Sequence, residues 1–535
     1  MRILKHITAL LACCMFSLSG HAVQIRREPG HRLPEYIIPT DPDNPVLWRG
    51  ISATYYTRAA APGSYATSDI QRTGTIEYPL VLIDFSDLSF TSTDDDSIRH
   101  RYDRIFNERG YSDPTVFTAH NTTIYGVSGS VSDYFRDQSY GQYNPVFKII
   151  GPIHLSKGYA YYGGGERDAS AHITEMIREA CDSIVAKGLA DLAGYADNGF
   201  IPQLSIIYAG RGENYADADP NTIWPHASSV DFRKEYPHVY NSGLRSANYI
   251  CVCELYWDTD IPDGIGTFCH EFSHTLGLPD YYNTADYTGK DDTENAAMGF
   301  WSLMDYGCYE NQGFSPVGYT AFEKYSLGWM DLEEITYAGA YTLNDITRKP
   351  DPAKDIHTAY RLNTGDDDQF IILENHLKTG WYRFHGCEGL MVTSVDYDKD
   401  IWGGNAINRY NPKHYRILPA DNDYKRFSNA GDLFPCQNVD SITTLGAPAL
   451  KAGESSPSFS IYRITRTDSL VSFYAGADMP SGIGNIKPDE TTVTVYDISG
   501  KPVLKTTTSD PEHISLPGPG IWIIKYGNIT RKVRL

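Results

Sequence analysis

The stretch FCHEFSHTLGLPDYYN (residues 268–283) places two histidines four residues apart, with a glutamate next to the first and an aspartate shortly after the second. Positions four apart project from one face of a helix, so His270 and His274 can share one metal ion. Glu271 then lies beside the metal without binding it, where it can take a proton from a bound water molecule. The alternative is a helix that merely holds two histidines, because this short pattern also arises by chance.

The residues that follow favour a metal site. Gly277 allows the backbone to leave the helix with a positive φ angle, and Asp280, three residues later, can turn back as a third ligand. Two neutral imidazoles and one carboxylate leave a fourth position open for water, which is typical of a catalytic zinc site. Glu294 is the competing third ligand. Its surroundings are polar, rich in turn residues and poor helix material, so the sequence favours Asp280.

A second motif, GFWSLMDYG (299–307), predicts a tight turn that carries Met304 below the two histidines. Such a Met-turn is typical of the metzincin proteases, and an ordinary core methionine is the alternative. Tyr306 lies two residues further on, where some metzincins have a phenol that reaches the metal or the oxyanion. Tyr306 is therefore a hypothesis for transition-state stabilisation, with simple packing as the alternative.

Hydrophobic periodicity around these motifs predicts an α/β layer structure. From about residue 331 onward short strands and turns dominate, which predicts a β-rich lobe. Residues 480–535 begin with a linker-like stretch and continue as short alternating strands, so we expect a separate small β module. In the α/β part, strands are expected at 78–87, 145–152, 203–210 and 248–257, and helices at 95–108, 129–138 and 168–187.

The N-terminal residues MRILKHITALLACCMFSLSGHA (1–22) combine a basic start, an apolar run and a small-residue end, which predicts a cleaved secretory signal. A lipoprotein signal that uses Cys13 is the alternative, but it leaves a very short apolar run before the cysteine. Residues 23–75 show the weak periodicity of a propeptide or of a disordered linker. No later stretch is long and apolar enough to cross a bilayer. We expect a secreted or cell-surface protein.

Composition argues against some partners and some chemistries. A formal net charge of −21 disfavours binding to nucleic acid or to anionic lipid. An exported chain can pair its cysteines, but Cys251 and Cys253 point to the same face of one strand and are poor partners for each other. Buried structural cysteine is expected, also for Cys269, since no local motif supports a cysteine hydrolase. His226 is expected to be a packed or solvated histidine.

Several motifs occur in the order of a known family. They are YPLVLIDFSD (78–87), GSVSDYFRDQSYGQ (129–142), TIWPH (222–226), DGIGTFCHEFSHTLGLPDYY (263–282), GFWSLMDYG (299–307), PVGYTAFEKYSLGW (316–329) and VTSVDYDKDIWGGNAIN (392–408). From about residue 78 to 435 the chain resembles the M6 metalloproteases, the immune inhibitor A-like metzincins. The resemblance implies a zinc endopeptidase that acts on protein or peptide substrates. It also implies one catalytic Zn2+ ion, with His270, His274 and Asp280 as ligands and Glu271 as the base.

The expected fold class is α/β (α+β), with a mixed sheet and a zinc helix in a metzincin-like catalytic domain. A chain of 535 residues is too long for one hydrophobic core, which supports several domains. The expected parts are a signal peptide at 1–22, a leader or propeptide at 23–75, the catalytic domain at 76–330, a β-rich lobe at 331–478 and a C-terminal β module at 479–535.

Two further features concern cofactors and export. Members of this family often carry an acidic loop suited to calcium before the strand that corresponds to 203–210. Here YADNGFIPQL (195–204) keeps Asp197 but has few further carboxylates, so a Ca2+ ion there is an option that the ligand count does not support. The tail, with GIWIIKYGNITRKV (520–533), is similar to the C-terminal sorting domains of Bacteroidetes type IX secretion. That similarity makes the secretion machinery a partner, and a plain β accessory module is the alternative.

Together these features predict a secreted zinc endopeptidase, made as a zymogen, in which Glu271 activates a zinc-bound water for attack on a peptide carbonyl. The alternative is a catalytically inactive surface adhesin or binding protein on a metzincin scaffold. A binding protein would tolerate loss of Glu271, whereas the ligands and the base are all present in this sequence.

Overall fold

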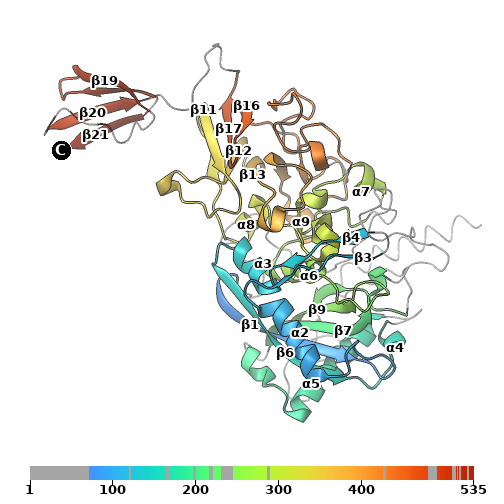
Figure 1. Cartoon of the computed structure of the whole chain (residues 1–535). Helices are drawn as coiled ribbons and strands as arrows, with labels where there is room; N and C mark the ends of the chain where they lie inside the picture. The colour runs from blue at the N-terminus through green and yellow to red at the C-terminus, as the bar shows by residue number, and fades with distance from the viewer. Residues whose placement is uncertain are drawn as a thin grey trace, which may run out of the picture. The chain divides into compact units, whose positions relative to one another are not determined.

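Figure 1 shows the computed structural model of the chain. The predicted signal peptide, most of the predicted leader and Asp197 lie outside the described residues. The chain divides into two compact units, one ending at Asp478 and the other beginning at Met479. Within the described part, no helix is both long enough and apolar enough to cross a bilayer. The described residues are 71–479, except 120–121, 164–168, 197–199, 216–220, 230–244, 286–289 and 426–428, and then 491–508, 514, 516, 518, 520–526 and 529–534.

A five-stranded mixed sheet forms the base of the first unit. Four of its strands run parallel, and a short antiparallel strand lies at one edge. The four parallel strands coincide with the predicted ones, whereas the edge strand is too short to give a periodic pattern in the sequence. The spatial order is β6 (Tyr143–His154), β1 (Gly74–Asp84), β7 (Phe200–Arg211), β9 (Arg245–Leu255) and β8 (His226–Ser229).

Helices cover both faces of this sheet, and the alternation of side chains along the strands explains how. Leu80 and Leu82 of β1 lie in one buried cluster, whereas Val81 and Ile83 lie in another. A mixed α/β architecture, as predicted, is therefore present. The first cluster holds residues of α2 (Asp95–Asn107), α3 (Val131–Gln138) and α6 (Ile265–Leu276), and the second holds residues of α4 (Tyr159–Gly163) and α5 (Ala169–Lys187).

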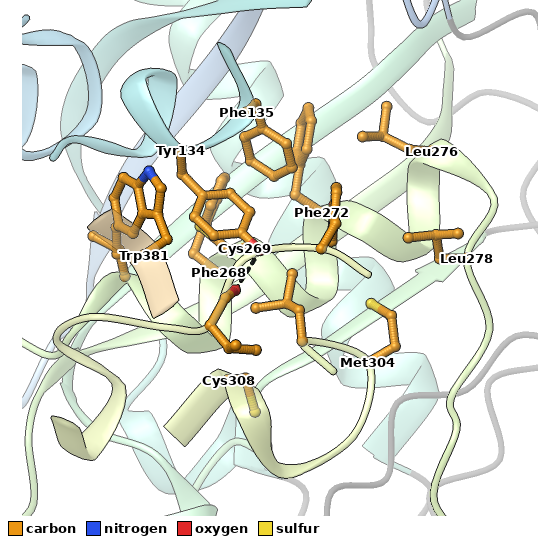
Figure 2. Close-up of a cluster of buried hydrophobic side chains, with 14 of the residues drawn as sticks. Tyr134, Phe135, Phe268, Cys269, Phe272, Leu276, Leu278, Met304, Cys308 and Trp381 are labelled. Carbon is orange, nitrogen blue, oxygen red and sulfur yellow. Dashed lines mark hydrogen bonds between the residues drawn. The ribbon is translucent and has the colours of Figure 1, made fainter. Parts of the chain in front are cut away.

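Apolar residues at helical spacing attach α6 to the sheet. Phe268, Phe272 and Leu276 are four residues apart in turn, and all three are buried. The ring centroid of Phe272 lies 5.2 Å from that of Tyr78 on β1, in an edge-on arrangement. Figure 2 shows these three helix residues in one buried cluster with Met304. This packing fixes the rotation of α6 about its axis, and with it the direction of the two histidines.

Two further sheets follow the α/β part within the same unit. Ile371 and Leu373 of β13 lie in a core that both sheets share, whereas Phe370 and Ile372 lie in the cluster that also contains α6. One face of the β-rich part therefore packs directly against the α/β part. The first sheet has the order β10 (Glu333–Glu334), β12 (Ala359–Asp366), β13 (Gln369–His376), β14 (Gly389–Asp396) and β15 (Tyr415–Ile417), and the second has the order β11 (Gly339–Asn344), β17 (Leu470–Gly476) and β16 (Ser460–Arg466).

Short elements connect these layers. One of them, α7 (Lys290–Glu294), lies in the polar segment for which the sequence predicts little helix, and it is only five residues long. The others are β2 (Ser112–Asp113) paired with β5 (Val127–Ser128), β3 (Phe117–Ala119) paired with β4 (Thr122–Ile124), α8 (Ala321–Ser326) and α9 (Lys399–Gly403).

The second unit is a four-stranded antiparallel sheet. Val493 and Val495, two residues apart on one strand, form a small buried core with Ile524. This unit has the short alternating strands that the sequence predicts, and its role in sorting stays a prediction. The spatial order is β19 (Pro502–Thr508), β18 (Thr491–Tyr496), β20 (Ile521–Tyr526) and β21 (Ile529–Arg534).

None of the seven cysteines in the described residues forms a disulfide bond. Cys251 and Cys253 lie two residues apart on β9, and both belong to the cluster on the α5 side of the sheet. Cys269 lies on α6 in the cluster on the other side. Burial raises the pKa of the Cys269 thiol well above its usual range, so this residue is a core residue rather than a nucleophile.

Candidate metal centre

The helix α6 ends in a turn that requires a positive φ angle. Gly277, directly after the helix, has a φ of 104°. Its amide donates to the carbonyl oxygen of His274 (3.0 Å), and the amide of Leu278 donates to that of Ser273 (3.1 Å). These two hydrogen bonds form a Schellman motif, in which the chain turns away from the helix axis. The turn allows Asp280 to lie beside the last turn of the helix.

Three side-chain atoms converge next to this turn. Oδ1 of Asp280 lies 3.2 Å from Nε2 of His270 and 3.3 Å from Nε2 of His274. The ligand atoms of these residues lie within 4.8 Å of one another, and all three side chains are buried. Atoms bound to a tetrahedral zinc ion at about 2.0–2.2 Å are separated by roughly 3.3–3.6 Å. The donor set and its spacing therefore fit one zinc ion, which these three residues would hold.

Backbone carbonyl groups select the tautomer of both histidines. Nδ1 of His270 lies 2.9 Å from the carbonyl oxygen of Leu303, and Nδ1 of His274 lies 2.8 Å from that of Leu278. A carbonyl oxygen can only accept a hydrogen bond, so each Nδ1 carries the proton. Nε2 of each ring, which faces Asp280, is then the nitrogen left to bind a metal ion.

Asp280 uses its two carboxylate oxygens differently. Oδ1 faces the imidazoles, whereas Oδ2 accepts a hydrogen bond of 2.7 Å from the side-chain amide of Asn405. Burial by itself would raise the pKa of Asp280, but the interactions with His274 and His270 hold this pKa well below its usual range. Asp280 is therefore a carboxylate at neutral pH, as a metal ligand must be.

Glu271 lies fully buried beside the three ligand atoms. Its Oε2 accepts a hydrogen bond of 2.6 Å from the backbone amide of Ala227 on β8, and lies 4.0 Å from Nε2 of His274. Burial raises the pKa of Glu271 to about 8, with smaller and opposing effects from His270 and Asp280. A divalent cation beside this carboxylate would lower its pKa again, so the group suits the exchange of protons near neutral pH.

The predicted Met-turn forms a tight loop directly beside α6. The carbonyl oxygen of Met304 accepts a hydrogen bond of 2.8 Å from the amide of Tyr281, next to Asp280. Oδ2 of Asp305 accepts hydrogen bonds from the amides of Met298 (3.0 Å) and Gly299 (2.8 Å). Figure 2 shows Met304 among the buried side chains around the helix. The loop thus holds both the carbonyl group that faces His270 and the segment that carries Asp280.

The other candidates from the sequence lie as follows. Glu294 is on α7, with 64% of its side chain exposed and Lys290 at 3.9 Å, so it does not join the cluster around Asp280. His226 is buried, with Nδ1 at 2.7 Å from the carbonyl oxygen of Trp224, and is a packed histidine.

Tyr306 is buried, and its ring packs among those of Tyr282, Phe300 and Tyr309 at centroid distances of 6.3–6.5 Å. These rings account for its packing. A role of its phenol at the metal stays a prediction.

Three contacts of the site come from residues that the sequence does not single out. They are the backbone amide of Ala227, the carbonyl group of Leu303 and the side chain of Asn405. Two are backbone groups, which leave no side-chain signal in a sequence. Asn405 belongs to the motif at 392–408, but no spacing rule connects it with Asp280, 125 residues earlier.

An α/β domain in which two imidazoles and a carboxylate converge, with a second carboxylate beside them, has the donor set of a catalytic zinc site. Comparison with known proteins agrees with this class. Residues 70–332 match the family described as immune inhibitor A peptidase M6, catalytic domain.

Two curated proteins are similar to parts of the chain. The chain is 24% identical over 327 residues to "Pre-pro-metalloprotease PrtV" of Vibrio cholerae serotype O1 (strain M66-2), which covers 53% of this chain and 33% of that protein. It is 26% identical over 237 residues to "Immune inhibitor A" of Bacillus thuringiensis subsp. alesti, which covers 38% of this chain and 33% of that protein. The chain thus spans only a third of the length of these relatives.

Proposed function

We propose that this chain is a secreted, zinc-dependent endopeptidase that hydrolyses peptide bonds of protein substrates. The observation that carries the proposal is the convergence of His270, His274 and Asp280 next to the buried carboxylate of Glu271. The M6 match over residues 70–332 and the metalloprotease name of the Vibrio relative support the same reaction. The predicted signal peptide and leader add export and a zymogen form to the proposal.

The carboxylate of Glu271 supplies the proton transfer of the proposed reaction. When bound, zinc would polarise the scissile carbonyl and lower the pKa of a water molecule. Oε2 of Glu271 is held by the amide of Ala227, whereas Oε1 is buried and has no hydrogen-bond partner among the described residues. Oε1 is therefore the atom that takes the proton of the attacking water and passes it to the leaving amine nitrogen.

The test is zinc content and casein cleavage of the full chain, with and without prior limited proteolysis to release an inhibitory leader. Wild type is compared with Glu271→Gln, which keeps the shape of the side chain but cannot accept the proton. We expect stoichiometric zinc in both and a loss of cleavage of about 10²–10⁴-fold in Glu271→Gln. Glu294→Gln is the matched control, because Glu294 is exposed and outside the cluster. It should retain both zinc and activity.

Three results would contradict the proposal or its mechanism. Absence of zinc from the wild-type protein would remove the metal site itself. Bound zinc with no cleavage of any protein by the wild type would favour the alternative, a surface binding protein that has kept the ligands. Retained cleavage in Glu271→Gln would exclude Glu271 as the base.

A further inference from the structure

The segment that carries Asp280 has no regular secondary structure to hold it. Residues 278–285 follow α6 without forming a helix or a strand. A backbone of this kind is held only by contacts with other parts of the fold. The position of the third ligand atom therefore depends on which groups bind this segment.

Asn405, two residues after the end of α9, makes two hydrogen bonds to Asp280 at once. Its Oδ1 accepts from the backbone amide of Asp280 (2.9 Å), and its Nδ2 donates to Oδ2 of the same residue (2.7 Å). Main chain and side chain of Asp280 are thus both held by one amide group. A carboxylate fixed in this way cannot rotate to present its other oxygen, so Oδ1 stays directed at the histidines.

Further contacts join the same two segments. The hydroxyl of Thr284 donates to the carbonyl oxygen of Asn405 (2.9 Å), and the side-chain amide of Asn408 donates to that of Tyr281 (2.6 Å). Asn405 is 95% buried and adopts a φ of 49°, in the left-handed region that asparagine tolerates better than most residues. Residues 405–408 therefore form a rigid support for residues 280–284.

We propose that Asn405 is a positioning residue for the metal site, and that the site is incomplete without the β-rich part of the chain. This inference rests on the proposed function, since it concerns the same zinc ligands. Asn405 lies beyond residues 70–332, which match the M6 catalytic domain. The ligands and the base come from that matched segment, but the group that orients Asp280 comes from outside it.

The test is the zinc affinity of the full chain, measured by competition with a chromophoric chelator. Asn405→Gly removes the amide and keeps a residue that tolerates positive φ. We expect zinc binding to weaken by about 10–100-fold, the range for groups that orient a metal ligand. Asn422→Gly is the matched control, because Asn422 has a φ of 58° and is exposed. Its zinc affinity should stay within about twofold of wild type.

One further measurement and one further variant separate positioning from folding. The absorption spectrum of the Co2+-substituted protein should change in Asn405→Gly and not in Asn422→Gly, because it reports the coordination of the metal. If Asn405→Gly does not fold, Asn405→Ser is used, since its short side chain cannot make both hydrogen bonds. Zinc affinity and a cobalt spectrum equal to wild type in a folded Asn405 variant would overturn the inference. A wild-type protein that binds no zinc would instead overturn the proposed function.

Discussion

The backbone amide of Ala227 donates a 2.6 Å hydrogen bond to Oε2 of Glu271, which connects the edge strand β8 to the carboxylate beside the three ligand atoms. The donor is a main-chain group, so the contact does not depend on which side chain occupies position 227. It fixes one oxygen of the carboxylate, and in the proposed mechanism the other oxygen, Oε1, takes the proton. The orientation of the Glu271 carboxylate therefore depends on the pairing of β8 with β9, which sets the position of the Ala227 amide.

The raised pKa of Glu271 predicts how the stability of the metal-free protein depends on pH. Burial raises this pKa from 4.5 to about 8, so between these values the folded state keeps a proton that the unfolded chain has lost. The free energy of unfolding therefore falls as pH rises through this window, by up to about 1.4 kcal/mol per pH unit from this group. Glu271→Gln cannot titrate and should lack this contribution.

The measurement is urea unfolding of both proteins in a chelator at pH 5, 6 and 7. Other buried carboxyl groups with raised pKa values, such as Glu310 and Asp263, are present in both proteins. Their contributions to the pH dependence therefore cancel when the two unfolding free energies are subtracted. The difference in unfolding free energy between wild type and Glu271→Gln should decrease steadily with pH. Parallel pH profiles would show that the Glu271 pKa is not raised.

Gly277→Ala should destabilise the fold and also weaken the site. A β-carbon at a φ of 104° strains the backbone, and at this position it would lie 2.6 Å from Nη2 of Arg72. We expect a loss of about 1–2 kcal/mol in unfolding free energy, together with weaker zinc binding because the turn directs Asp280. Urea unfolding and chelator competition measure the two effects.

Gly188→Ala is the matched control for this prediction. Gly188 ends α5 with a φ of 63° and the same type of capping hydrogen bonds, and no atom lies within 4 Å of a β-carbon there. It should lose a similar amount of stability and keep its zinc affinity. Equal zinc loss in both variants would mean that the effect is general destabilisation.

Removal of the metal should lower the melting temperature of the wild-type protein. A ligand that binds only the folded state stabilises it by about 2.7 kcal/mol when its free concentration is a hundred times its Kd. Thermal unfolding with excess zinc and with excess chelator should therefore give different Tm values. His270→Ala should show no such difference, whereas Glu294→Gln should behave as wild type. An equal shift in His270→Ala would place the stabilising zinc elsewhere.

Phe272→Ala should be among the more destabilising core substitutions. The ring of Phe272 is fully buried, with centroids of Tyr78, Phe135 and Phe147 at 5.0–5.5 Å. Its removal leaves a cavity beneath α6, which costs about 3–5 kcal/mol in unfolding free energy. Tyr337→Ala is the control, since Tyr337 is 60% exposed and should change stability by less than about 0.5 kcal/mol. Similar values for the two variants would contradict the packing role of Phe272.

Much of the candidate site follows from local sequence. His270 and His274 converge because residues four apart lie on the same face of a helix. Asp280 lies beside them because Gly277, with a positive φ, turns the chain back towards the helix. The sequence also favours Asp280 over Glu294 as the third ligand, because only Asp280 closely follows a glycine turn at the end of the helix. The parallel strands and the longer helices could be located as well, since each carries an apolar pattern long enough to be periodic.

The contacts of Ala227, Leu303 and Asn405 could not be found in this way. Two are main-chain groups with no sequence signal, and the third is separated from its partner Asp280 by 125 residues. Likewise, the sequence offered metal contact and packing as alternatives for Tyr306, and its surroundings depend on how residues 299–307 pack. Local sequence patterns predict helix faces and turns, because residues close together in the sequence form these structures. Which distant groups orient the ligands depends on the packing of the β-rich part and β8 against α6, since those contacts exist only once the chain has folded.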